Sequence, residues 1–78
     1  MPRAVLDVLL AVHGAPAAAR NPRSRQYVRV EGLPSGQERS GAILLAVASG
    51  YLAGNRPLHS VSLTELGRMV LRADGMIE

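Results

Sequence analysis

The segment of residues 35–54 constrains the fold more than any other part of the chain. Ser35 and Glu38 have the spacing of a capping box, in which two side chains satisfy free backbone N–H groups at the start of a helix. From residue 42 to residue 53 only Ser49 is clearly polar, and the Gly-Asn-Arg-Pro sequence at 54–57 marks a stop. The sequence therefore predicts a central helix that has no solvent-facing side and is covered all round.

One arc of this expected helix carries small residues, and the rest carries bulky ones. At 100° per residue the small arc holds Ala42, Ala46, Gly50 and Ala53. Such an arc lets a second backbone approach closely, either from another helix of the chain or from a second copy. We therefore predict these four residues as a helix-packing or dimer seam. A membrane span is not expected, because the apolar run has 12 residues and a bilayer core requires roughly 20.

The length of 78 residues predicts a single small domain, residues 1–78, with a correspondingly small core. The chain has no cysteine and only two histidines, so neither disulfides nor a cysteine/histidine metal cluster is available to stabilise it. Two short helices cannot easily cover a central helix that is apolar all round. Association with a second copy is the remaining route, and we predict a homodimer.

The first half of the chain predicts a helix, a loop and a strand. An apolar face runs through residues 2–13, and Gly14 and Pro16 end this helix. Residues 14–26 hold two prolines, three arginines and no large apolar residue, which is typical of a flexible loop. Residues 27–31 then alternate, with Val28 and Val30 on one side of a short strand. Its partner is either residues 58–62 or the same strand of a second subunit.

The last predicted helix begins at Ser62, which repeats the capping-box spacing with Glu65, and closes at Asp74 and Gly75. Its apolar face consists of Leu63, Leu66, Met69, Val70, Ala73 and Ile77. The sequence as a whole thus predicts a mainly α fold with one or two short β-strands, a small α+β arrangement. Its three helices follow the order helix, strand, helix, helix, around the buried central one.

Enzymatic chemistry has little support in these residues. A Walker phosphate loop requires a lysine, and the chain has none. The six acidic residues are spread one per element, so no convergent catalytic triad or carboxylate pair is indicated. We expect no catalytic, cofactor-binding or metal-binding residues. The first residues lack a convincing signal-peptide cleavage site and carry Asp7 inside their apolar run, so we expect a cytoplasmic protein.

The basic residues are more informative, since the net charge is +3 and all nine basic side chains are arginine. Four of them lie within ten residues beside one tyrosine, and these candidate contact residues are Arg20, Arg23, Arg25, Tyr27 and Arg29. Arginine makes planar, bidentate contacts to phosphate and carboxylate groups. The cluster therefore predicts an acidic partner, either nucleic acid such as duplex DNA or an acidic protein. A solvated basic loop is the alternative.

The order strand, helix, connection, helix in residues 26–74 resembles the ribbon-helix-helix family of small dimeric DNA-binding repressors. In that family two copies pair one strand each and place the ribbon in the major groove. The resemblance implies that Tyr27, Arg29 and Glu31 face the groove. It also implies that helix starts near Ser35 and Ser62 contact phosphate.

These observations predict a small, non-enzymatic binding protein, most simply a dimeric nucleic-acid-binding regulator of transcription that uses an Arg-rich arm and strand. The alternative is an inhibitor or adaptor of the kind that phages and mobile elements encode, binding a host protein or ribonucleoprotein complex. Binding of nucleic acid by the purified chain separates the two.

Overall fold

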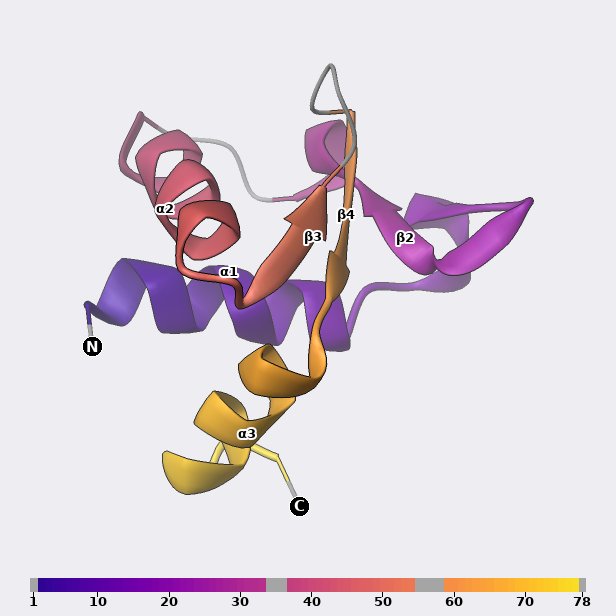
Figure 1. Cartoon of the computed structure of the whole chain (residues 1–78). Helices are drawn as coiled ribbons and strands as arrows, with labels where there is room; N and C mark the ends of the chain where they lie inside the picture. The colour runs from indigo at the N-terminus through magenta and orange to yellow at the C-terminus, as the bar shows by residue number, and fades with distance from the viewer. Residues whose placement is uncertain (1, 34–36, 55–58, 78) are drawn as a thin grey trace.

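Three α-helices and a four-stranded antiparallel sheet form the part of the chain that the computed structural model describes, residues 2–33, 37–54 and 59–77 (Figure 1). In chain order the elements are α1 (Arg3–His13), η1 (Ala17–Ala19), β1 (Arg20–Asn21), β2 (Ser24–Arg29), η2 (Val30–Gly32), α2 (Gln37–Ala48), β3 (Leu52–Gly54), β4 (Ser60–Leu63) and α3 (Glu65–Ala73). None of the helices in these ranges is long and apolar enough to cross a membrane.

The sheet corrects the expected fold class. Its strand order is β1-β2-β4-β3, with every neighbouring pair antiparallel. The prediction of a mainly α fold with one or two strands is therefore wrong, and the fold is α+β in the order α-β-α-β-α. Two of the strands were missed: β1 lies in the segment expected to be a loop, and β3 lies in the segment expected to be helix.

The apolar run divides into a helix and a strand at Gly50. This glycine has a φ of +83°, its N–H donates to the Val47 carbonyl at 3.1 Å, and the Tyr51 N–H donates to the Ala46 carbonyl at 2.9 Å. This pair of hydrogen bonds is the Schellman motif, which ends a helix at a left-handed residue. α2 therefore stops at Ala48, and the expected continuation through residue 53 is wrong.

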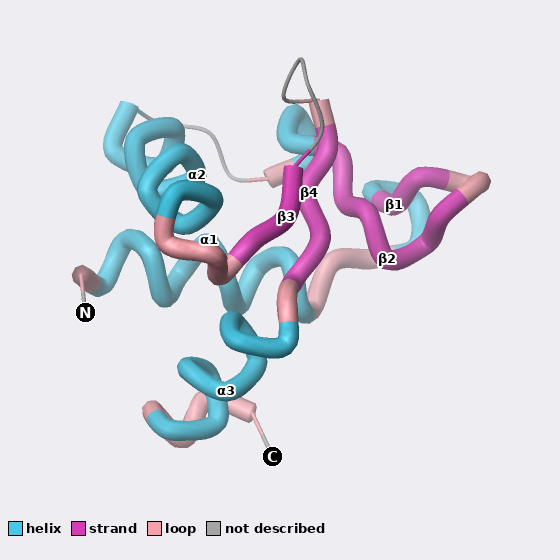
Figure 2. Tube along the Cα trace, viewed as in Figure 1, coloured by secondary structure: helices cyan, strands magenta, loops and turns pink. Residues whose placement is uncertain are grey.

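The core lies between α1, α2 and one face of the sheet (Figure 2). α1 contributes five buried residues to it, and the sheet contributes Val28 and Val61, both fully buried. Ala42 and Ala46 of α2 are also buried in this cluster. Their small side chains let the backbones of α1 and α2 approach closely, which stabilises the core within a single chain. In Figure 1, α1 passes behind β3 and β4.

The position of β2 rules out the ribbon expected from the resemblance. β2 pairs with β1 along one edge and with β4 along the other, so neither edge is free for the same strand of a second copy. The alternative partner, residues 58–62, is confirmed: Tyr27 lies opposite Ser62, and Arg29 opposite Ser60. Ser62 is thus a buried strand residue and not a helix cap. The expected cap at Ser35 and the stop at 55–57 lie outside the described residues.

α3 buries only part of the predicted face, because Leu63, Val70 and Ile77 pack against the core but the centre of its buried side is shifted. Its N-cap is Thr64, whose hydroxyl oxygen accepts from the Gly67 N–H at 3.1 Å. The buried residues of the helix are Gly67 and Leu71, whereas Leu66 and Met69 of the predicted apolar face are exposed. The predicted end is confirmed, because Gly75 has a φ of +70° and closes a second Schellman motif.

Candidate nucleic-acid-binding surface

Alternation along β2 gives the sheet two chemically different faces. Val28 faces the core, so its neighbours Tyr27 and Arg29 lie on the opposite face, and the exposed Arg25 precedes them on β2, where the register with β1 is irregular. Arg25 and Arg29 are exposed and Tyr27 is half-buried. We call the surface formed by these three residues the outer sheet face. The alternation predicted from the sequence holds for Tyr27, Val28 and Arg29, whereas the predicted continuation through Val30 and Glu31 is wrong, because β2 ends at Arg29 and these two residues lie in η2.

The central strand supplies small residues to this face. Ser62 lies opposite Tyr27, and Ser60 lies opposite Arg29, and residues directly opposite in an antiparallel pair share a face. Both serines are buried. The chemistry that a ligand would meet on the outer sheet face therefore comes from the longer side chains of β2, which stand above these serines.

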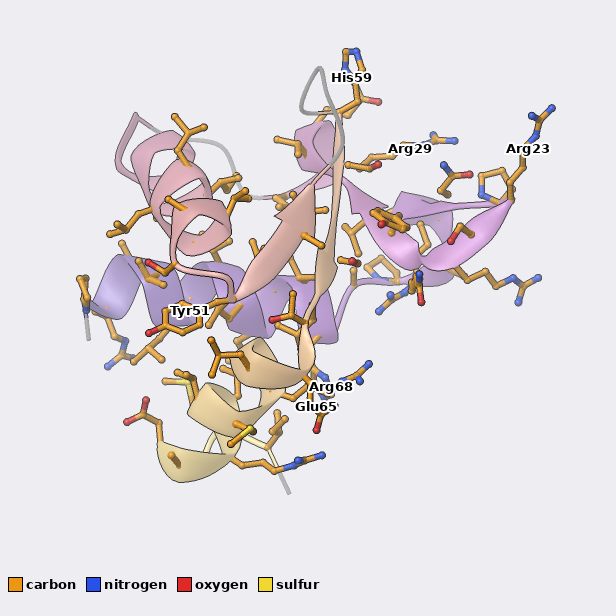
Figure 3. All side chains as sticks on the ribbon, in the orientation of Figure 1. Arg23, Arg29, Tyr51, His59, Glu65 and Arg68 are labelled. Carbon is orange, nitrogen blue, oxygen red and sulfur yellow. The ribbon has the colours of Figure 1, made fainter. Side chains whose placement is uncertain are left out.

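A two-residue turn at Pro22 and Arg23 joins β1 to β2. The Asn21 side-chain oxygen accepts from the Arg23 backbone N–H at 2.9 Å, an Asx-turn that fixes the reversal. Arg23 is exposed at the tip of the hairpin, and Figure 3 shows it and Arg29 extending away from the α-helices. The Asn-Pro dipeptide is a recognised turn signal, and it was the one sequence feature that could have revealed β1.

Arg20 has a different role from the other arginines of the cluster. Because it pairs with Val28, its side chain lies on the core side of the sheet. Its guanidinium donates to the carbonyls of Ala15 at 3.0 Å, Arg25 at 3.1 Å, His13 at 3.2 Å and Val12 at 3.3 Å. Four of its five N–H donors are thus engaged, three by carbonyls at and just after the C-terminal end of α1, where a cation is favoured by the helix dipole, and one by a carbonyl of β2. Arg20 fixes the hairpin to α1.

The charge on the strands is of one sign. β1 to β4 contain three arginines and, within these described strands, no acidic residue. The ion pairs found across the described ranges join Arg3 to Asp7, and Arg68 and Arg72 to Glu65, all on helices. Arg23, Arg25 and Arg29 take part in none of them. Their charges are therefore available to an external anion.

A hollow of about 320 Å³ lies at the base of the hairpin, beside α3, and His13, Arg20, Gln26 and Arg68 are among the residues lining it. Arg68 is 3.6 Å from Glu65, and the hollow adjoins the carbonyl end of α1. Since that end of a helix disfavours anions, the hollow does not extend the basic surface.

The predicted seam residues do not form one surface. Ala42 and Ala46 are in the core, Gly50 is in the turn after α2, and Ala53 is in β3. In the described ranges, no group of three His, Asp or Glu side chains could hold a metal ion.

Comparison of the chain with models of protein families, with curated proteins and with solved structures found no match.

Proposed function

We propose that the chain is a small, non-enzymatic nucleic-acid-binding protein whose contact surface is the outer sheet face together with the hairpin tip. The observation that carries the proposal is the alternation at the end of β2, which sets Tyr27 and Arg29 on the face opposite the core, with the exposed Arg25 on the same strand and no acidic residue in the described strands. Arg23 continues this positive surface to the end of the hairpin.

The spacing of the arginines suits a phosphate backbone. Arg25 and Arg29 are four positions apart along β2, which separates them by at most about 13 Å at about 3.3 Å per residue. Two long, flexible side chains at this separation can reach different phosphates of one strand. Contacts of this kind are independent of sequence and weaken with salt, because each releases condensed counterions.

Tyr27 between the two arginines favours a single strand over a duplex. Unpaired bases stack on aromatic rings, whereas the bases of a duplex already stack on one another. Docking of a ribbon built from two copies of β2 is excluded by its pairing with β1 and β4. We therefore propose that Tyr27 stacks on a base while Arg25 and Arg29 bind the phosphates on either side of it.

Fluorescence anisotropy with a labelled single strand and its duplex, measured over a salt series, tests this proposal. Three arginine contacts at about 0.7 each give a log-log slope of about −2, so a fourfold rise in salt lowers the affinity of the single strand about 20-fold. Tyr27→Ala is expected to weaken binding about tenfold, and Tyr27→Phe to preserve it, since stacking on an aromatic ring contributes about 1–3 kcal/mol per base.

The matched charge variants are Arg29→Gln on the sheet and Arg72→Gln on α3. Arg29→Gln is expected to lower the affinity and make the salt slope shallower. Arg72→Gln is expected to leave the affinity and the slope unchanged, because Arg72 lies on α3, 3.8 Å from Glu65. Absence of binding at low salt would refute the nucleic-acid proposal. The hairpin arginines would then be assigned to an acidic protein partner.

A further inference from the structure

A pocket of about 420 Å³ lies between the start of α1 and the end of α2. Its lining includes Pro2, Val5, Leu45, Ser49 and Tyr51. The first two come from the start of α1, and Leu45 comes from the last turn of α2. The other two belong to the segment that connects α2 to β3, and Figure 3 shows Tyr51 at this place. None of these five residues belongs to the outer sheet face, so the proposed function does not use the pocket.

The walls of the pocket are held in place by the fold. Val5 is only 2% exposed and is part of the core. The Tyr51 N–H donates to the Ala46 carbonyl at 2.9 Å, and the Tyr51 carbonyl accepts from the Thr64 N–H at 3.1 Å. The pocket is therefore preformed, and its volume is within the range of about 300–1,000 Å³ that is usual for small-molecule sites.

The lining combines apolar surface with two hydroxyl groups. Pro2, Val5 and Leu45 supply the apolar part. Ser49 and Tyr51 each supply a hydroxyl that can donate or accept a hydrogen bond. Small-molecule sites have this composition, in which apolar walls supply affinity and a few polar groups fix the orientation of the ligand. The lining therefore suits a mainly apolar molecule that carries one hydrogen-bonding group.

The electrostatics of the pocket favour an uncharged ligand. None of the described residues that line it is charged. Pro2 is the N-cap of α1 and Ser49 follows the last residue of α2, so the positive end of one helix dipole meets the negative end of the other. The guanidinium of the neighbouring Arg3 is already paired with the Asp7 carboxylate, at 3.4 Å. An ion that entered the pocket would lose water without gaining an opposite charge.

We infer that this pocket binds a small uncharged molecule that has an apolar ring or chain and one hydroxyl group. The apolar part packs against Val5 and Leu45, and the hydroxyl bonds to that of Ser49 or Tyr51. This inference does not depend on the binding of nucleic acid, because the two sites share no residue.

Titration of the ¹⁵N-labelled chain with benzyl alcohol, followed by amide chemical shifts, tests the inference. Saturable shifts are expected at Val5, Leu45, Ser49 and Tyr51, with a Kd of about 1 mM, a reasonable value for a ligand of about eight non-hydrogen atoms. Benzoate and benzylammonium have nearly the same shape and carry a negative and a positive charge at pH 7. Both are expected to bind at least about tenfold more weakly than the alcohol.

The matched variants are Leu45→Glu and Leu44→Glu, at adjacent positions of α2. Leu45 lines the pocket, whereas Leu44 is not among the described residues that do. Their side chains are 48% and 62% exposed, so both variants are expected to fold, which circular dichroism checks. Leu45→Glu places a carboxylate in the apolar wall and is expected to raise the Kd for benzyl alcohol at least about tenfold, and Leu44→Glu less than about twofold.

Saturable binding of the alcohol that is weakened in Leu45→Glu and kept in Leu44→Glu supports the inference. Three results overturn it: no saturable shift up to about 10 mM benzyl alcohol, equal binding of benzoate or benzylammonium, or an unchanged Kd in folded Leu45→Glu. The comparison of the three probes uses the wild type, so it decides the matter even if a variant does not fold.

Discussion

Gly67 brings the first turn of α3 against the carbonyl of Tyr51. A Cβ at this position would clash with the Tyr51 carbonyl oxygen and lie 2.7 Å from a Leu63 methyl carbon. The same contact is stabilised by Thr64, whose hydroxyl lies 2.6 Å from the Gly50 carbonyl oxygen and 2.9 Å from that of Tyr51, so its proton can bind either. A residue without a side chain is therefore required where the first turn of α3 packs against Tyr51, just before β3.

Two glycine-to-alanine substitutions test this close approach. Gly67→Ala is expected to destabilise the chain by about 2 kcal/mol, because backbone atoms have no room to relax, and to lower Tm by about 10 °C. Gly41→Ala, in the exposed middle of α2 with no heavy atom within 4 Å of the added carbon, is expected to raise Tm by about 4 °C. Equal thermal shifts for the two variants would show that Gly67 is not constrained by packing.

Structural features set by neighbouring residues could be predicted from the sequence, whereas those set by contacts between distant residues could not. Gly75 as a helix stop and Val28 as an inward residue follow from the nearest neighbours in the sequence, and the structure confirms both. The requirement for Gly67 depends on Tyr51, 16 positions earlier, and the role of Arg20 depends on carbonyls up to eight positions earlier. No pattern of neighbouring residues encodes such contacts.

The hairpin of β1 and β2 depends on α1 for its position. Arg20 donates to carbonyls at the end of α1 and to the Arg25 carbonyl of β2, so one side chain links the helix to both strands. Because β1 has only two residues, the strand pairing alone is a weak constraint. We therefore expect the orientation of the hairpin to be set largely by this arginine.

Arg20→Met keeps the aliphatic stem and removes all the N–H donors. It is expected to lower the free energy of unfolding by about 1–3 kcal/mol, the range for several hydrogen bonds to partly exposed carbonyls. The backbone amides of Ser24–Arg29 are also expected to exchange hydrogen faster in this variant than in the wild type. Arg23→Met, at the exposed tip, is the control, with an expected change within about 0.5 kcal/mol. Equal free energies of unfolding for the two variants, measured in urea, would show that Arg20 does not have this structural role.

Elements with their own start and stop signals could be predicted from the sequence, and the others could not. α1 was expected at residues 2–13 and occupies Arg3–His13. α2 was expected to continue through Ala53, because an uninterrupted apolar run has no periodicity that separates a buried helix from a buried strand. In this chain Gly50 makes the division, and Leu52–Gly54 pairs with β4 as a strand.

At the scale of the whole molecule, charge and apolar area lie on different surfaces. Among the described residues, the exposed arginines outside ion pairs follow β2 and the hairpin tip, whereas the most exposed leucines and Met69 follow α2 and α3. The arginine cluster was visible in the sequence, but its division between the structural Arg20 and the exposed arginines was not. The apolar face of α3 was also visible, but its exposure depends on which face Gly67 and Leu71 bury.

Chemical-shift mapping of the ¹⁵N-labelled protein with an unlabelled single strand of about ten nucleotides tests the central claim, that the outer sheet face binds nucleic acid. The largest shifts are expected at Arg23 and along Ser24–Arg29, with smaller ones in the neighbouring Ser60–Leu63, while the amides of Leu44 and Met69 stay unchanged. Shifts confined to α2 and α3, or none at low salt, would contradict the claim.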